Sequence, residues 1–138
     1  MSNEIMAKNA PDPVGAYPHA RKVGNLLFLS GIGPRKPGTN EIPGVELDKN
    51  GNLSSFDFEA QCHSVFQNVR TVLEGSGSKW EDLVDVTVFL TNMRRDFVTY
   101  NRIYKEYFGE AMPCRTTVGI SSLPTQISIE LKCIAVVS

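Results

Sequence analysis

The chain has 138 residues, with 14 basic and 15 acidic side chains and a formal net charge of −1. Its length predicts one domain over residues 1–138, and a hydrophobic content of 41% excludes a disordered chain. Basic residues never occur in runs longer than a pair, so the basic stripe typical of nucleic-acid-binding proteins is missing and no nucleic-acid partner is expected.

Residues 1–18 contain three prolines and no long apolar stretch, so we expect a loose segment without a signal peptide. No apolar run along the chain is long enough to cross a bilayer, which favours a cytoplasmic protein with no membrane partner. Three cysteines without paired spacing favour a reducing compartment over a disulfide framework.

Two hairpins are expected in the first half of the chain. Residues 21–30 contain a Gly-Asn pair followed by an apolar run, which predicts a tight turn and a buried strand. Residues 34–55 form a polar insertion rich in turn signals, and an Asn-Gly pair within it predicts a second, smaller hairpin. Long irregular insertions are often functional, although many are surface decoration.

A helix is predicted over residues 57–75, where apolar side chains recur at steps of three and four. Asp57 or Ser55 can cap its start. The sequence Ser-Lys-Trp-Glu at 78–81 is a capping-box pattern and predicts a short turn. Residues 84–91 are rich in β-branched side chains and predict a strand.

A second helix is predicted over residues 96–108, with Asp96 at its start and an aromatic stripe along one face that is most simply core. Two extended segments, at 115–121 and 126–137, end the chain. This order of elements predicts an α+β fold in which two helices lie on one face of a mostly antiparallel, mixed sheet.

Arg115 is the sharpest candidate for binding chemistry, because a guanidinium can hold a carboxylate through two parallel hydrogen bonds. Pro113 restricts the backbone just before it. The alternatives are a structural salt bridge and an ordinary surface arginine, since most charged side chains are exposed.

Glu130 is the candidate for proton transfer. In its strand, the alternate apolar residues predict a buried face, and Glu130 and Lys132 point to the other face. Partial burial would raise the pKa of this carboxyl, and a nearby arginine would lower it. With Arg115 on a neighbouring extended segment, the pair could hold a small acid and act on a water beside it; the alternative is an ion pair with Lys132 or Arg115.

No metal is expected. Zinc deaminases carry H-x-E and P-C-x-x-C motifs, and Cys114 begins the second pattern, but Thr117 stands where its second cysteine would be. His19 and His63 both lack a glutamate two residues later. All three cysteines are therefore expected to be packed thiols.

Tyr17, Ser30 and Gly31 flank the first predicted hairpin. Their side chains or main chain could orient a substrate, although ordinary turn residues have the same composition. The glycines around Ser30 do not form a phosphate-binding loop, because the G-x-x-x-x-G-K pattern is absent.

Short motifs along residues 12–137 occur in an order and with a spacing similar to those of the Rid/YjgF family of enamine/imine deaminases. They include Gly15-Ala16-Tyr17, Leu29-Ser30-Gly31, Asn68-Val69, Tyr100-Asn101, Pro113-x-Arg115, Leu123-Pro124 and Ile129-Glu130. The resemblance implies a chorismate-mutase-like fold, a homotrimer with a site at each subunit interface, and no cofactor.

Further motifs resemble the 2-aminomuconate deaminase branch of that family, which acts in bacterial breakdown of aromatic compounds. They are Gly33-Pro34-Arg35, Ile42-Pro43-Gly44-Val45, Ala60-Gln61-Cys62 and Cys114-Arg115-Thr116-Thr117. Broad-specificity members usually carry cysteine at the position of Thr117. The family uses mostly the main chain of that residue, so the resemblance still implies a site there and favours the branch.

The resemblance implies catalytic roles for Arg115, Glu130 and Thr117. Arg115 would clamp the carboxylate of a small dicarboxylate enamine, Glu130 would activate water, and the Thr117 main chain would orient the reacting atoms. Substrate-binding roles fall to Tyr17, Ser30, Gly31 and Arg35. We expect Arg35 to bind the second carboxylate, and Arg95 and Arg21 are the alternative ligands. The alternative without a function is that Arg35 is an ordinary solvated arginine in a loop.

The leading hypothesis is a deaminase that hydrolyses 2-aminomuconate to 4-oxalocrotonate (2-oxohex-3-enedioate) and ammonia. The first alternative is a broad-specificity deaminase of 2-iminoacids and enamines. An RNA-directed relative is disfavoured by the near-neutral charge. A non-catalytic binder of small acids on the same scaffold is the remaining alternative.

Overall fold

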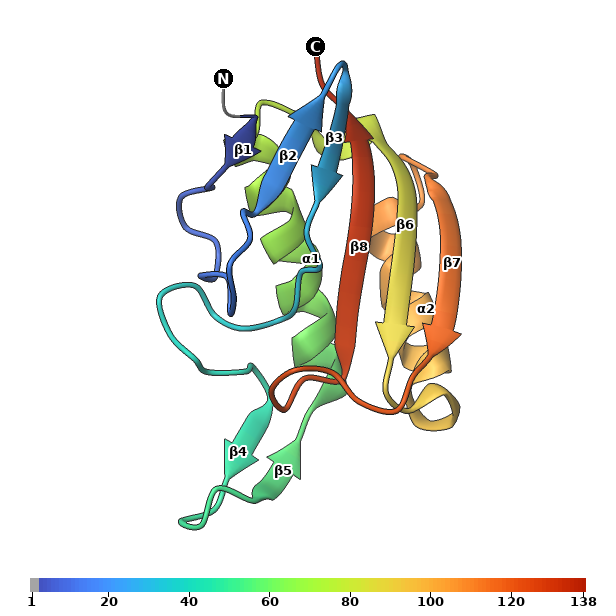
Figure 1. Cartoon of the computed structure of the whole chain (residues 1–138). Helices are drawn as coiled ribbons and strands as arrows, with labels where there is room; N and C mark the ends of the chain where they lie inside the picture. Colours follow the sequence, from blue (N-terminus) through green and yellow to red (C-terminus); the bar gives the residue numbers. More distant parts are fainter. Residues whose placement is uncertain (1–2) are drawn as a thin grey trace.

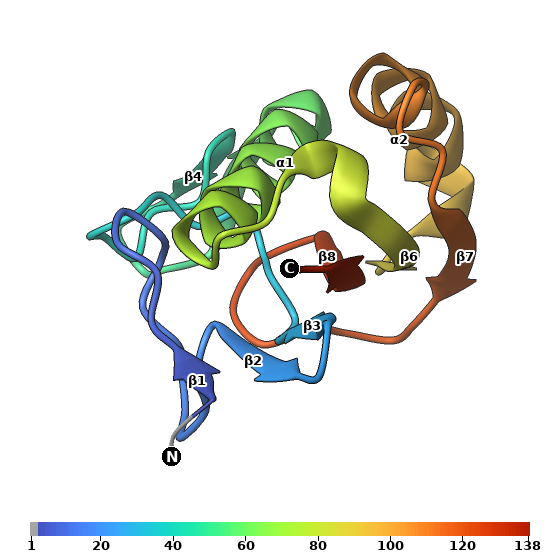
Figure 2. The same ribbon diagram turned by 90° about the horizontal axis from the view of Figure 1, so that it is seen from above.

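The structure is a computed structural model and describes residues 3–138. Its centre is a six-stranded sheet in the order β1-β2-β3-β8-β6-β7, and both α-helices lie on one side of it (Figures 1 and 2). All neighbouring strands are antiparallel except β6 and β7, so the predicted α+β fold with a mixed sheet is confirmed. The strands are β1 Glu4–Ile5, β2 Ala20–Val23, β3 Leu26–Leu29, β6 Leu83–Leu90, β7 Cys114–Gly119 and β8 Ile129–Val136.

Helix α1 (Phe58–Gly75) begins where the sequence predicts, because the Asp57 side chain accepts a hydrogen bond from the Ala60 N–H. Helix α2 (Met93–Phe108) begins three residues before the predicted start at Asp96. Asn92 is its N-cap and accepts from the Arg95 N–H, whereas Asp96 lies inside the first turn.

Both predicted hairpins are confirmed. Strands β2 and β3 meet at Gly24, whose φ of 62° suits a tight turn. Strands β4 (Val45–Leu47) and β5 (Leu53–Phe56) form a separate two-stranded sheet that projects from the body of the molecule (Figure 1). The insertion therefore carries an element of its own, placed against the N-terminal end of α1.

Three local predictions are corrected by the structure. Cys114 is exposed, so only Cys62 and Cys133 are the packed thiols that were expected at all three positions. The N-terminal segment is not wholly loose, because β1 pairs antiparallel with β2. The short 3-10 helix η1 (Trp80–Asp82) follows residues 78–79 without a side-chain cap. The Ser78 hydroxyl instead donates to the Val136 carbonyl at 2.9 Å, so it ties the turn to β8.

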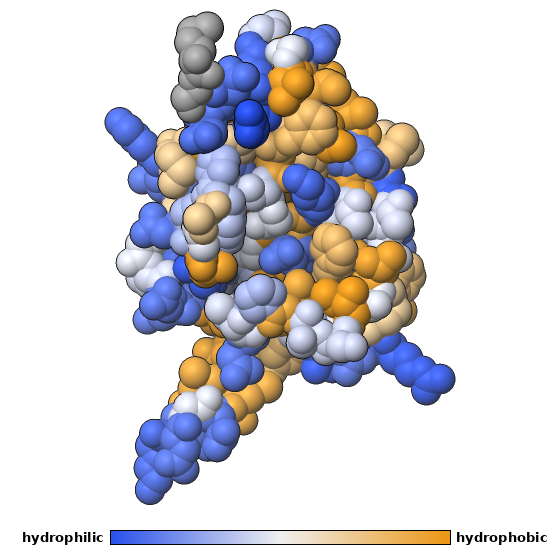
Figure 3. Space-filling model, in the orientation of Figure 1, coloured by the Kyte–Doolittle hydropathy of each residue, from blue (hydrophilic) through white to orange (hydrophobic). Residues whose placement is uncertain are grey.

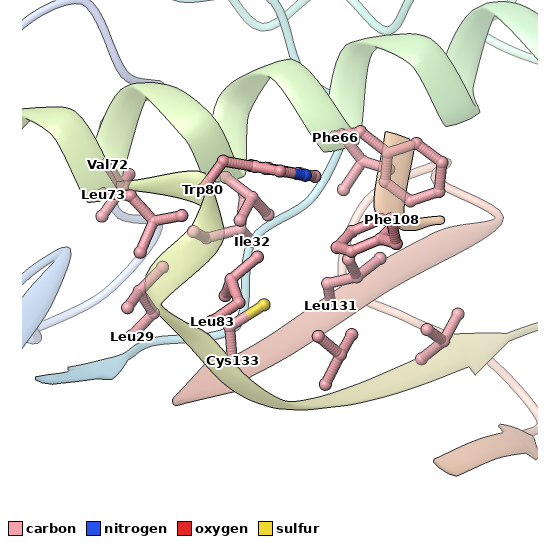
Figure 4. Close-up of a cluster of buried hydrophobic side chains, with 14 of the residues drawn as sticks. Leu29, Ile32, Phe66, Val72, Leu73, Trp80, Leu83, Phe108, Leu131 and Cys133 are labelled. Atoms are coloured by element: carbon pink, nitrogen blue, oxygen red, sulfur yellow. The ribbon is translucent and has the colours of Figure 1, made fainter. Parts of the chain in front are cut away.

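The core fills the space between the sheet and the helices (Figure 4). Strand β8 follows the predicted alternation: Leu131 and Cys133 are fully buried, whereas Glu130 and Lys132, on the opposite face, are half-buried. Phe66 of α1 packs edge to face on Phe108 of α2, with ring centroids 5.2 Å apart. Each large aliphatic side chain buried here stabilises the fold by about 1.5–3 kcal/mol.

The other face of the sheet has no layer over it among residues 3–138 and is the face toward the viewer in Figure 3, where apolar and polar side chains are mixed. Leu26 and Val136, on neighbouring strands, are each 38% exposed there. We call this the open face. No helix in the described part of the chain is both long and apolar enough to pass through a bilayer.

Candidate functional site

Arg115 lies on β7, at one edge of the sheet, and faces the helices. Its register partner on β6 is Val86, which is fully buried beneath the helices. The guanidinium donates to the Asn101 side-chain oxygen at 2.8 Å. Its central carbon lies 4.7 Å from the Tyr104 ring centroid and 5.3 Å from that of Tyr100. We call these four residues, together with Thr117, the Arg115 cluster.

Every partner of Arg115 is electrically neutral. Within residues 3–138 it forms no ion pair, so the alternative of a structural salt bridge to Glu130 is wrong. The rings below orient the guanidinium through cation–π contacts, while the side chain stays exposed. An exposed, oriented and uncompensated cation is suited to binding the carboxylate of a ligand.

Tyr100 and Tyr104 remain neutral supports of this cluster. Burial raises the pKa of both phenols, and the nearby Arg115 charge opposes that rise without cancelling it. The Tyr100 hydroxyl shares a 2.8 Å hydrogen bond with the Thr117 hydroxyl. Because the Thr117 side chain is held in this way, its main chain, on the outermost strand of the sheet, is the part left for a ligand.

Glu130 lies on the open face, two strands away from β7. Gly31 allows its carboxylate to come close: a Cβ added at Gly31 would stand 2.7 Å from Oε2 of Glu130. Two main-chain hydrogen bonds between Ile32 and Leu131, at 2.8 and 2.9 Å, fix this approach. Glycine at position 31 is therefore explained by the carboxylate next to it.

Partial burial raises the pKa of Glu130 above its ordinary value of 4.5. No cation among the described residues forms an ion pair with it. The predicted alternative partner, Lys132, instead donates from Nζ to the Leu29 carbonyl. A half-buried carboxylate with a raised pKa and no counter-ion is suited to taking a proton from water and returning it.

A small cavity of about 40 Å³ lies beside Gly31, and we call it the strand-end pocket. Its lining includes Tyr17, Ser30, Gly31 and Arg35, so the structure brings together all four predicted substrate-binding residues. The Ser30 hydroxyl donates to the Pro18 carbonyl at 2.7 Å, which leaves its oxygen lone pairs as acceptors. The Tyr17 oxygen accepts from the Val14 N–H at 3.2 Å, so its own proton remains available.

The arginines expected as alternatives to Arg35 do not share this pocket. Arg95 is paired with the buried carboxylate of Asp96 at 2.7 Å and stacks 4.3 Å from the Phe56 ring centroid. Arg21 lies on β2 and is not part of the pocket lining. Of the three predicted cations, Arg35 alone faces Tyr17, Ser30 and Gly31.

The two halves of the predicted site do not meet within one protomer. Strand β6 separates β7 from β8, so the expectation of neighbouring strands for Arg115 and Glu130 is wrong. Their register also places them on opposite faces, because Arg115 aligns with Val86 and Glu130 with Phe89 on β6. The sheet itself therefore stands between the Arg115 guanidinium and the Glu130 carboxylate.

Sequence reasoning missed the support around Arg115. Tyr100 and Tyr104 are predicted only as core, and Asn101 has no role in that interpretation. The signal was present in the spacing, since residues four apart on a helix share a face and can sit together under one strand. No group of three or more His, Cys, Asp or Glu side chains that could hold a metal ion occurs within residues 3–138.

Comparison with known proteins gives a consistent result over nearly the whole chain. The model of the Endoribonuclease L-PSP family matches residues 7–137. A RutC family protein of Pyrococcus horikoshii is 38% identical over 98% of both chains. The 2-iminobutanoate/2-iminopropanoate deaminase of Escherichia coli is 34% identical and covers 99% of this chain and 98% of its own. The crystal structure of E. coli TdcF with bound serine superimposes with a TM-score of 0.83 at 31% identity, covering 98% of each chain.

Proposed function

Because the chain belongs to the Endoribonuclease L-PSP family, to which the Rid/YjgF proteins resembled by its motifs also belong, we propose that it is a hydrolytic deaminase of small enamine and imine acids. One observation carries the proposal: an oriented guanidinium and a half-buried carboxylate, both in family motifs, have no ion-pair partner among residues 3–138. The similar E. coli deaminase supports the reaction class.

The reaction follows from the chemistry of the two groups. Arg115 binds the carboxylate next to the C=N bond, a charge-assisted contact that contributes about 1.5–3 kcal/mol. Glu130 removes a proton from water as the oxygen adds to the imine carbon, and then returns that proton to the nitrogen. The resulting carbinolamine then gives up its hydroxyl proton, which Glu130 passes to the same nitrogen as the C–N bond breaks, so one imine and one water give one ketone and one ammonia.

The substrate we propose is 2-aminomuconate, an enamine with two carboxylates. Protonation on carbon converts it to the imine, and hydrolysis then gives 2-oxohex-3-enedioate. The support is the motif resemblance at Thr117 and at residues 33–35, together with the presence of Arg35 in the strand-end pocket. A broad-specificity deaminase of 2-iminoacids is the second candidate, favoured by the similarity to the E. coli 2-iminobutanoate/2-iminopropanoate deaminase.

The proposed site is composite, with Arg115 from one protomer and Glu130 and the strand-end pocket from another. Two observations support this arrangement: the sheet separates the two halves, and the pocket of about 40 Å³ is much smaller than the roughly 300–1,000 Å³ typical of ligand sites. Exposed apolar side chains on the open face fit burial against another copy. A head-to-tail contact that closes after three copies gives the homotrimer that the family resemblance implies.

Subunit mixing tests the composite site directly. Arg115→Ala and Glu130→Gln should each abolish most ammonia release from 2-iminopropanoate and 2-aminomuconate. When the two variants are co-expressed with different tags and the mixed trimer is purified, about one third of its sites should contain both wild-type residues and regain activity. No regained activity in a verified mixed oligomer would contradict the arrangement, and a wild-type rate equal to that in buffer would contradict the deaminase.

A further inference from the structure

Arg35 is a positive charge without a negative partner. Its Nη2 donates to the main-chain carbonyl of Asp12, and it forms no ion pair within the described residues. The adjacent Lys36 is different, because it pairs with Glu41 at 3.3 Å. Arg35 is half-buried and lines the strand-end pocket together with Tyr17 and Ser30.

The main chain that carries Arg35 is held in place by α1. Asn68 donates from its side-chain nitrogen to the carbonyls of Gly33 and Arg35, at 2.9 and 2.8 Å. Ser64 donates to the Pro34 carbonyl at 2.7 Å. Three hydrogen bonds over three consecutive residues distinguish this segment from an ordinary solvated loop, and all of them end on main-chain oxygens. Substituting Arg35 therefore leaves the anchoring intact.

Another part of the pocket lining is held by His19, which is only 8% exposed. Its Nδ1 accepts from the Ala7 N–H at 2.9 Å, so Nε2 carries the hydrogen and donates to the Pro11 carbonyl at 2.7 Å. The hydrogen bond to Pro11 therefore fixes the main chain directly before Asp12, whose carbonyl contacts Arg35. The main chain next to both partners of the Arg35–Asp12 contact is therefore held by hydrogen bonds.

The size of the pocket indicates what it can hold. A volume of about 40 Å³ suits a carboxylate group or a few waters, and it cannot enclose a six-carbon diacid. The bulk of such a ligand would extend toward the Arg115 cluster of another protomer. A built cation in a carboxylate-sized cavity is the arrangement expected at the far end of a dicarboxylate.

We infer that Arg35 is the specificity-determining residue for a second carboxylate, so that the protein selects dicarboxylate over monocarboxylate ligands. This inference rests on the proposed function, because it takes Arg115 as the ligand of the first carboxylate. In the bound state a carboxylate oxygen replaces or joins the Asp12 carbonyl as the acceptor of the Arg35 hydrogen bonds. A neutral acceptor is thereby exchanged for a charged one.

Two unreactive ligands isolate this effect: trans,trans-muconate (hexa-2,4-dienedioate) and sorbate (hexa-2,4-dienoate), which share a carbon skeleton and differ by one carboxylate. Calorimetric titration of the assembled wild type should give roughly 10- to 150-fold tighter binding of muconate, as expected for one charge-assisted contact. Arg35→Ala should lose that preference while binding sorbate with unchanged affinity. Lys36→Ala, the matched control, should behave as the wild type.

The outcomes separate this inference from the proposed function, since binding requires no turnover. Equal affinity of the wild type for muconate and sorbate, or an unchanged muconate affinity in Arg35→Ala, would overturn the role of Arg35 even in an active deaminase. An inactive wild type that still prefers muconate through Arg35 would keep the dicarboxylate site and reject the deaminase. A melting temperature equal to that of the wild type verifies that Arg35→Ala is folded.

Discussion

The Arg115 cluster and the surroundings of Glu130 control a charge in opposite ways. Arg115 stays exposed at the sheet edge and is steadied by two aromatic rings and an amide, so its charge is fully available. Glu130 is half-buried on the open face, where loss of water raises its pKa. Binding a carboxylate requires an exposed, fully charged cation, whereas proton transfer requires a partly buried carboxylate with a raised pKa. One sheet provides both environments because the two groups lie on its opposite faces.

Removing the carboxylate of Glu130 should have the largest effect on turnover. A small effect would mean that Glu130 is not the group that transfers the proton. Glu130→Gln keeps the shape of the side chain and cannot accept the proton from water, so kcat should fall by roughly 10²–10⁴. Ligand affinity should change little, because the carboxylate clamp lies elsewhere. Ammonia release under saturating 2-iminopropanoate measures kcat, and a loss confined to KM would show that Glu130 only binds substrate.

The second test concerns the fork of Arg115. Arg115→Lys keeps the charge but loses the paired hydrogen bonds and the planar stacking on Tyr104, so kcat/KM should fall by about 100-fold. Arg94→Lys, an exposed position on α2, is the control and should be neutral. A near-normal rate in Arg115→Lys would mean that a point charge is sufficient and that the aromatic support is incidental.

The third test asks whether catalysis depends on the close approach of the Glu130 carboxylate to Gly31. Gly31→Ala places a methyl group within 2.7 Å of the present Oε2 position, and the carboxylate, as the end of a flexible side chain, should move aside. The fold should therefore survive, with a melting temperature close to that of the wild type, while kcat falls by roughly 10- to 100-fold through misplacement of the base. Unchanged kcat would show that the carboxylate works equally well when displaced.

The smallest effect should appear in stability. Because the folded state holds the Glu130 proton more tightly than the unfolded state does, wild-type stability falls as pH rises through the interval between the ordinary and the raised pKa. Glu130→Gln escapes this loss, so its melting temperature should exceed that of the wild type only above that interval. Thermal melts from about pH 4 to about pH 8 measure the difference, with Glu106→Gln as an exposed control. A difference independent of pH would argue against a raised pKa.

Local patterns predicted the local structure well. The helix over 57–75 and the alternation along β8 follow from periodicity, which depends on short-range geometry. The start of α2 was misplaced because Asn92 and Asp96 are both plausible caps; in the structure Asn92 accepts from the Arg95 N–H, whereas Asp96 pairs with the Arg95 side chain. Hydrogen bonding within the first turn is not visible in a residue pattern.

The candidate site was only half predictable. Its residues could be named from motifs, and Tyr17, Ser30, Gly31 and Arg35 do line one pocket. The relation between Arg115 and Glu130 could not be predicted, because β6 inserts between β7 and β8 although it precedes both in sequence. Strand order is set by long-range pairing, and it decides which charges share a cavity.

The placement of Arg115 and Glu130 on opposite faces of one sheet has a consequence for behaviour in dilute solution. Under the proposed arrangement an isolated chain contains no complete catalytic centre, so activity per chain should decline once dilution dissociates the oligomer. A damaging change in one copy would impair centres shared with two neighbours. The association equilibrium of the oligomer would then determine the fraction of complete active sites, in addition to contributing to the stability of the fold.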